Sequence, residues 1–104
     1  MPSITHMVSF KLKKGLSEPV IKELTEQCLS MNNSIPAVGN LKVKFDLGLD
    51  PERNQDFMLI VKFNDIDAYK NYSTNPIHLG IIENYIKPAI VPGTRVAMQF
   101  EDDA

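Results

Sequence analysis

The sequence has few of the features that would link it to a disulfide, a membrane or a nucleic acid. Its single cysteine, Cys28, cannot form a disulfide within the chain, and no Cys/His cluster has structural zinc spacing. The apolar runs fall well short of the roughly 18 residues that a membrane span needs, and the first residues lack a signal-peptide pattern. Eleven basic and 13 acidic residues give a net charge of −2. We therefore expect a cytoplasmic protein that binds neither nucleic acid nor membrane.

The composition is that of an ordinary globular chain. It has 104 residues, of which 43% are hydrophobic and 23% charged, and no internal repeat or low-complexity segment. This length is enough for one hydrophobic core. We therefore expect a single domain over residues 1–104 that needs no cofactor.

Alternation of apolar and polar residues predicts four strands. They span residues 4–12, 41–47, 56–63 and 95–100. The more apolar faces are expected to meet the helices, and they carry Val8 and Phe10, Val43 and Phe45, Leu59 and Val61, and Met98 and Phe100. The opposite faces carry Met7, Met58, Ile60 and Ala97 beside Lys42, Lys62 and Arg95. This second surface is too apolar to remain bare, so we predict a homodimer in which two sheets pack face to face as a barrel.

Two helical regions lie between the strands. Ser17 predicts the N-cap of the first, and its expected apolar face carries Val20, Ile21, Leu24, Cys28 and Met31. Asn64 or Asp65 is expected to cap a short helix through Tyr69 and Tyr72, and Asn75 followed by Pro76 opens another that Pro88 and Pro92-Gly93 stop. The order β-α-β-β-α-β predicts a ferredoxin-like α+β fold, in which a four-stranded antiparallel sheet carries its helices on one face.

His78 has an unusual predicted setting. If a helix begins at Pro76, the histidine shares the buried stripe with Ile81, Ile82 and Tyr85. The positive end of the helix dipole and the apolar surroundings both disfavour imidazolium, so we expect a lowered pKa and a neutral ring at pH 7. Such a ring can act as a base or hold a ligand, although it can also be a structural histidine. The same two readings remain open for His6, which lies on the apolar face of the first strand.

Motifs along the whole chain resemble one family, the stress-responsive α/β-barrel domain. They are His6-Met7-Val8-Ser9-Phe10-Lys11 followed by Gly15, Ile35-Pro36-Ala37-Val38, Pro51-Glu52-Arg53-Asn54, Tyr72 with Asn75-Pro76-Ile77-His78, and Tyr85-Ile86-Lys87-Pro88. The family includes stress-induced plant proteins and a plant cyclase that closes a linear polyketide into olivetolic acid. The resemblance implies a dimeric ferredoxin-like barrel with a site between sheet and helices.

The cyclase resemblance also implies residue roles. Its base corresponds to His78, its orienting or substrate-holding tyrosine to Tyr72, and a supporting histidine to His6. A further histidine of the cyclase corresponds to Phe57, and two aromatic pocket positions correspond to Thr25 and Cys28, so the pocket differs. We expect a small apolar or polyketide-like ligand to be bound by Val8, Phe10, Leu24, Cys28, Phe57, Leu59 and Ile82.

Three functions remain open at this point. The first is an enzyme for aldol-type or Claisen-type ring closure, in which His78 removes a proton beside a carbonyl and Tyr72 hydrogen-bonds the oxyanion. The second is a non-catalytic, stress-associated protein that binds a small apolar ligand. The third is a cofactor-independent monooxygenase, a reaction of related barrels. The carboxylates Asp46, Asp50 and Glu52 lack calcium-loop spacing, and we expect no metal.

Overall fold

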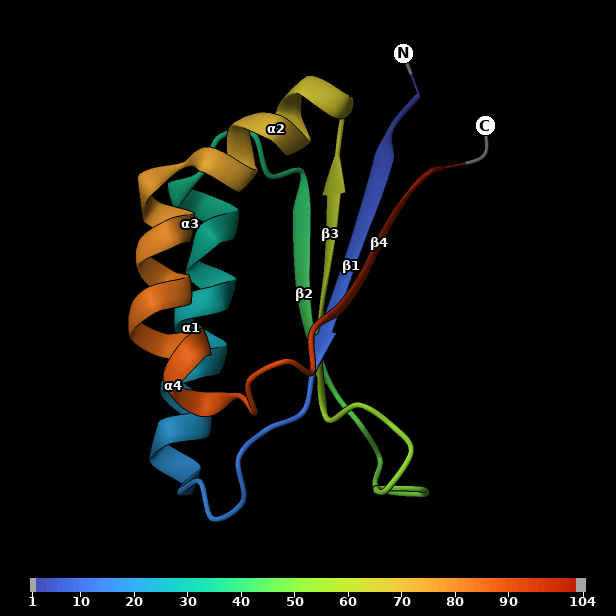
Figure 1. Ribbon diagram of the computed structural model, residues 1–104. Helices are drawn as coiled ribbons and strands as arrows, with labels where there is room; N and C mark the ends of the chain where they lie inside the picture. Colours follow the sequence, from blue (N-terminus) through green and yellow to red (C-terminus); the bar gives the residue numbers. More distant parts are fainter. Residues whose placement is uncertain (1, 103–104) are drawn as a thin grey trace.

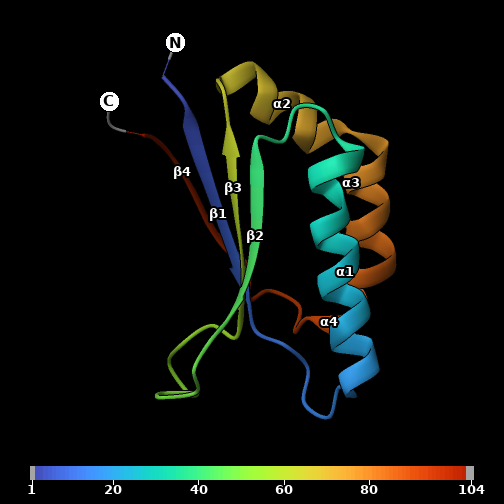
Figure 2. The same cartoon turned by 180° about the vertical axis from the view of Figure 1, so that it is seen from behind.

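The computed structural model describes residues 2–102. Its elements are β1 (Ile4–Phe10), α1 (Glu18–Ser34), β2 (Asn40–Phe45), β3 (Phe57–Phe63), α2 (Ile66–Thr74), α3 (Pro76–Ile81), a π-helical turn η1 (Ile82–Ile86), α4 (Lys87–Ala89) and β4 (Val96–Glu101). The four strands pair antiparallel in the order β2-β3-β1-β4. All helices lie on one side of this sheet, as the two opposite views show (Figure 1, Figure 2). The predicted ferredoxin-like α+β fold is therefore confirmed.

Side-chain caps begin the three longer helices where the sequence predicts them. The Ser17 hydroxyl accepts a hydrogen bond from the Val20 N–H at 3.4 Å, and Asp65 accepts one from the Ala68 N–H at 2.8 Å. The Asn75 side-chain oxygen accepts a hydrogen bond from the Ile77 N–H at 2.9 Å. Each cap satisfies a backbone donor that has no partner inside its helix. The Asn75 cap separates α2 from α3 and so sets the position of His78.

Pro88 does not stop the last helical region, contrary to expectation. It lies within α4, and the region ends at Ala89, ahead of Pro92 and Gly93. Proline has no N–H and its ring crowds the carbonyl four residues earlier, so the ordinary helical ladder is interrupted here. The preceding turn widens instead, and the Lys87 N–H donates to the Ile82 carbonyl five residues back.

The hydrophobic core lies between the sheet and the helices. It contains Ile4, Val8, Phe10, Leu24, Cys28, Met31, Leu41, Phe57, Leu59, Val61, Phe63, Tyr72, Ile81 and Ile86, among others. Apart from the residues of β4, two residues that were predicted to lie in this core, Val20 and Phe45, are exposed instead. Val20 is in the first turn of α1, and Phe45 is the last residue of β2. Both occupy ends of elements, where the facing layer no longer covers the side chain.

The predicted orientation of β4 is wrong. His6 pairs with Gln99 and Val8 with Ala97, whereas Met7 pairs with Met98. Because His6 and Val8 face the helices, Gln99 and Ala97 do so as well, and Met98 lies on the opposite face. The same alternation places Val96 and Phe100 beside Met98 on that open face. The reason is that β4 is an edge strand, whereas the helices pack on β1, β2 and β3, so its apolar residues were not drawn toward the helical layer.

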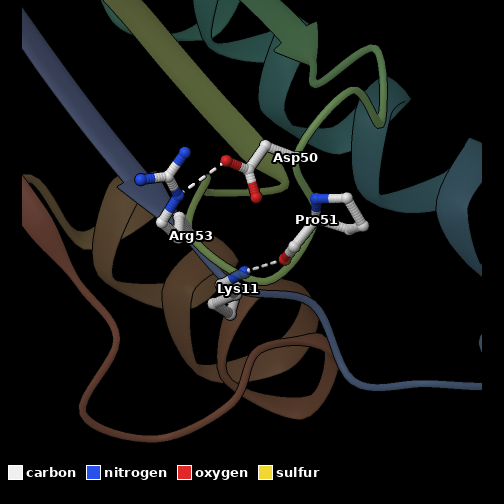
Figure 3. A network of polar contacts seen from close by, with 4 residues as sticks. All are labelled: Lys11, Asp50, Pro51 and Arg53. Atoms are coloured by element: carbon white, nitrogen blue, oxygen red, sulfur yellow. Dashed lines mark hydrogen bonds and ion pairs between the residues drawn. The ribbon is translucent and has the colours of Figure 1, made fainter.

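The loop between β2 and β3 is tied to the end of β1. Arg53 Nε forms an ion pair with Asp50 at 2.7 Å, and Lys11 Nζ donates to the Pro51 carbonyl at 2.5 Å (Figure 3). The Asp56 carboxylate also accepts from the Leu12 N–H at 2.8 Å. The Asp50 carboxylate is thus used within the loop.

Within residues 2–102, no helix is long and apolar enough to cross a membrane.

Candidate functional site

The fold brings together the three residues that the sequence singles out as catalytic. Tyr72 of α2 and His78 of α3 have ring centroids 4.1 Å apart, at an interplanar angle of 32°. His6 of β1 also lies beside the tyrosine, with its ring centroid 6.2 Å from that of Tyr72. The Asn75 cap allows this arrangement, because it turns the chain between α2 and α3 so that the tyrosine and the histidine face each other.

His78 is half-buried and is expected to be neutral. Burial lowers its pKa, and the positive charge of Arg95 acts in the same direction. The backbone carbonyls of Ser73 and Tyr72 act in the opposite direction, but burial is the largest influence. The lowered pKa confirms the predicted direction. Its Nδ1 atom is buried and makes no hydrogen bond to any group within residues 2–102.

His6 is buried and has a defined hydrogen-bond partner. Its Nδ1 lies 2.8 Å from Nε2 of Gln99, the residue directly opposite on β4. Burial lowers its pKa to about 4, with further lowering from Arg95 and from His78. An amide nitrogen can only donate, so this contact requires a lone pair on Nδ1 and places the proton of the neutral ring on Nε2.

Tyr72 is only 1% exposed. Burial raises the pKa of its hydroxyl, and Cys28 and Tyr69 add to this effect. The phenol is therefore protonated at neutral pH and is available as a hydrogen-bond donor. At pH 7 the site contains two neutral imidazoles and a neutral phenol, which together can accept one proton and donate hydrogen bonds.

The predicted ligand-binding residues occupy the core beside these three side chains. Val8, Phe10, Leu24, Cys28, Phe57 and Leu59 are buried, whereas Ile82 is partly buried against them. Burial raises the pKa of the Cys28 thiol to about 12, so this cysteine is a packing residue and not a nucleophile. Contact between these residues and a ligand stays a prediction. Among residues 2–102, no group of three or more His, Cys, Asp or Glu side chains is placed to hold a metal ion.

Three residues of the site were missed from the sequence. Tyr69 lies with its ring centroid 5.2 Å from that of His6, Gln99 bonds His6, and Arg95 acts electrostatically on both histidines. Tyr69 has a signal, since it precedes Tyr72 by three residues and so shares its helix face. Gln99 and Arg95 were assigned to the wrong face of β4. With that strand correctly oriented, its polar residues at alternate positions would have indicated a polar wall of the site.

Comparison with known proteins finds one matching family model and many solved structures of similar fold. A family model described as the stress responsive A/B barrel domain matches residues 4–102. Among solved structures, a dimeric ferredoxin-like protein of unknown function from Thermobifida fusca has 24% identity over 97% of this chain and 92% of its own, with a TM-score of 0.80. A hydroxynitrile lyase from Passiflora edulis has 19% identity over 98% and 94%, with a TM-score of 0.82.

A third solved structure is a protein of the same family, with a ferredoxin-like fold, from Mesorhizobium loti. It has 18% identity over the full length of both chains and a TM-score of 0.80. No curated protein matches the sequence. At these identities the likeness to solved structures shows the fold alone.

Proposed function

The chain belongs to the stress responsive A/B barrel domain family, and from this premise we propose that it is a small acid–base enzyme acting on a carbonyl compound. In this proposal His78 removes a proton from the carbon next to a carbonyl. The observation that carries the proposal is the Tyr72–His78 pair, with ring centroids 4.1 Å apart and both groups held neutral. A neutral imidazole beside a protonated phenol is a base next to a hydrogen-bond donor.

The carbonyls of Ser73 and Tyr72 are the backbone groups that act on the His78 ring, and they raise its pKa against the larger lowering by burial. The buried Nδ1 makes no hydrogen bond within residues 2–102. A neutral imidazole keeps a lone pair on one of its two nitrogens, and in this proposal that nitrogen is the base.

The reaction then follows with its protons balanced. The unprotonated ring nitrogen of His78 takes the proton, the C–H electron pair forms an enolate, and the Tyr72 hydroxyl donates a hydrogen bond to the enolate oxygen. The enolate carbon attacks a second carbonyl of the same molecule, forming a carbon–carbon bond, and the imidazolium returns its proton to the new alkoxide. Burial makes the imidazolium costly, which favours this return. The neutral His6 N–H is a second donor for the oxyanion.

The structural relatives bear on the reaction class only in outline. One of them is named a hydroxynitrile lyase, so this fold supports enzymes. We propose an aldol-type or Claisen-type ring closure for the present chain because its site holds a base and oxyanion donors next to an apolar core, which suits an extended apolar carbonyl substrate.

We also propose that the working unit is a homodimer formed through the open sheet face. Val96 and Met98 are each 61% exposed on that face, where Met7, Met58 and Ile60 are half-buried. An apolar surface of this kind marks an interaction site on a small protein. The Thermobifida fusca relative is described as dimeric. The orientation of β4 enlarges this apolar face relative to the sequence-based expectation.

The test is proton exchange at carbon, which isolates the first step. Acetophenone is incubated with the protein in D₂O, and loss of its methyl proton signal is followed by NMR. We expect exchange above the buffer rate, reduced more than about tenfold by His78→Gln and by Tyr72→Phe. Asn71→Gln, a change next to the tyrosine on the exposed side of α2, serves as the control. Exchange no faster than buffer would reject the base mechanism and leave non-catalytic ligand binding as the function.

A further inference from the structure

A cavity of about 310 Å³ lies between α2 and β4, next to His6. Its walls are mainly apolar, and Ile4, Ile66 and Tyr69 are among the residues that line it. This volume is at the lower end of the range for small-molecule sites, and the combination of apolar walls with a few polar groups is typical of them. None of the ligand-binding residues expected from the sequence lines this cavity.

Two of the lining residues connect the cavity directly to the catalytic candidates. The Tyr69 ring packs against His6, with centroids 5.2 Å apart, and Gln99 Nε2 is 2.8 Å from His6 Nδ1. The Gln99 amide carries two N–H donors, and the bond to His6 uses one of them. The second N–H is available to a hydrogen-bond acceptor bound beside β4.

The charges at the cavity indicate a neutral occupant. Lys70 and Glu101 both line it, one positive and one negative, so their effects on a charged molecule oppose each other. Transfer of a charged group to apolar walls without a partner of its own is costly. The lining therefore favours a molecule that is apolar, aromatic or branched, and that carries one acceptor oxygen.

We propose that this cavity binds a small neutral aromatic or alkyl carbonyl compound, with the Gln99 side-chain N–H donating to the carbonyl oxygen and the Tyr69 ring packing on the apolar body. A ligand in the cavity contacts Gln99 and Tyr69, and because both residues touch His6, binding also changes the surroundings of the His6 ring. The site does not depend on base chemistry at His78, so it extends beyond the proposed function and can be tested separately from it.

Acetophenone serves as the binding probe, with benzoate and benzylammonium as charged comparators of similar shape. Each is titrated into ¹⁵N-labelled protein, and the signals of the Tyr69 backbone, the Gln99 side-chain amide and the His6 ring are followed. We expect acetophenone to shift all three sets. Both charged comparators should bind more than about tenfold more weakly. Benzoate binding as tightly as acetophenone would overturn the neutral-ligand assignment.

A matched pair of variants tests the location. Ile66 and Ile77 are 46% and 44% exposed and lie in the first turns of α2 and α3, but only Ile66 lines the cavity. Ile66→Trp should fill the space and weaken acetophenone binding more than about tenfold, whereas Ile77→Trp should leave it within about twofold. Equal effects of the two changes, or shifts centred on another part of the surface, would reject the cavity.

Two further variants separate the parts of the argument. Gln99→Leu keeps the side-chain size but removes both donors, so it should weaken acetophenone more than toluene, which has no acceptor oxygen. His78→Gln should bind acetophenone as the wild type does while losing proton exchange. Loss of exchange with binding intact supports both proposals. Unchanged exchange in His78→Gln would remove the base mechanism without affecting the cavity, and absence of acetophenone binding to the wild type would remove the cavity.

Discussion

Acidification to pH 5 should destabilise this protein, with the largest contribution from His6. Burial lowers the pKa of its folded ring to about 4 from an ordinary value of 6.5. The unfolded chain therefore binds a proton at a pH where the folded chain does not. The stability that the neutral ring contributes is complete above pH 6.5 and is lost as the pH falls from 6.5 toward 4.

The magnitude follows from the two pKa values. The difference between about 4 and 6.5 corresponds to about 3.4 kcal/mol in all, since each pH unit is about 1.4 kcal/mol. At pH 5 the unfolded ring is almost fully protonated and the folded ring is still mostly neutral. The loss between pH 7 and pH 5 is therefore about 2 kcal/mol, a large part of the stability of a domain of this size.

Urea unfolding followed by far-UV circular dichroism at pH 7 and pH 5 measures this loss. Urea leaves the ionic strength unchanged, and the protein concentration is held fixed because dimer formation would affect the midpoint. The ordinary pKa values of free Asp and Glu side chains, about 3.9 and 4.3, lie below this window. The comparison is with His6→Gln, in which the titrating ring is absent and an amide can still meet Gln99.

The wild type should lose about 2 kcal/mol more than His6→Gln over this interval. His78→Gln is the control. The pKa of His78 is also lowered, so this change removes a second pH-dependent contribution of the same sign, whereas the His6 contribution should persist. Equal pH dependence in the wild type and His6→Gln would refute the reasoning, as would an NMR titration that places the His6 pKa near its ordinary value.

Two further predictions concern the open sheet face and the glycines. Met98→Lys should convert a dimer of twice the 11.7 kDa chain mass to a monomer in sedimentation equilibrium. Leu79→Lys, an equivalent change at an exposed position of α3, should leave the dimer intact. A wild-type monomer at micromolar concentration would contradict the interface. Gly80→Ala should stabilise by about 0.5–1 kcal/mol, because the position is helical and an added Cβ meets nothing within 4 Å. Gly39→Ala should destabilise, since its Cβ would lie 2.9 Å from the Lys62 carbonyl oxygen, and urea unfolding that gives both changes the same sign would count against this packing.

Local signals were sufficient for the starts of α1, α2 and α3 but not for the pairing of the site residues. The Asn75-Pro76 pair predicts the start of α3, and from that start the helical period places His78 toward the core. Its closeness to Tyr72 followed only from the family resemblance, because no periodic pattern relates residues on two separate helices. The distances within the His6, Tyr72 and His78 group depend on the angle between α2 and α3, which the sequence does not specify.

The orientation of β4 could not be obtained in this way. Both faces of the segment carry some apolar character, and the rule that the more apolar face is buried assumes a covering layer on one side only. An edge strand beyond the helices lacks that layer, and here its larger apolar residues, Val96, Met98 and Phe100, lie on the open face. The error matters for function because it removed Gln99 and Arg95 from the predicted site.

Contacts at both ends of β4 explain why the strand keeps this register. A shift of one residue would turn Met98 toward His6 and Gln99 toward the open face, exchanging the two surfaces completely. Before the strand, the Gln55 side chain donates to the Thr94 carbonyl at 2.7 Å. After it, the Asp102 carboxylate accepts from the Ser3 hydroxyl at 3.0 Å, and the Asp102 N–H donates to the Ser3 carbonyl at 2.9 Å. A slipped strand would break these contacts at both ends at once. Polar groups outside the site therefore hold Gln99 against His6, and they keep the apolar residues of β4 on the surface that is available to a second subunit.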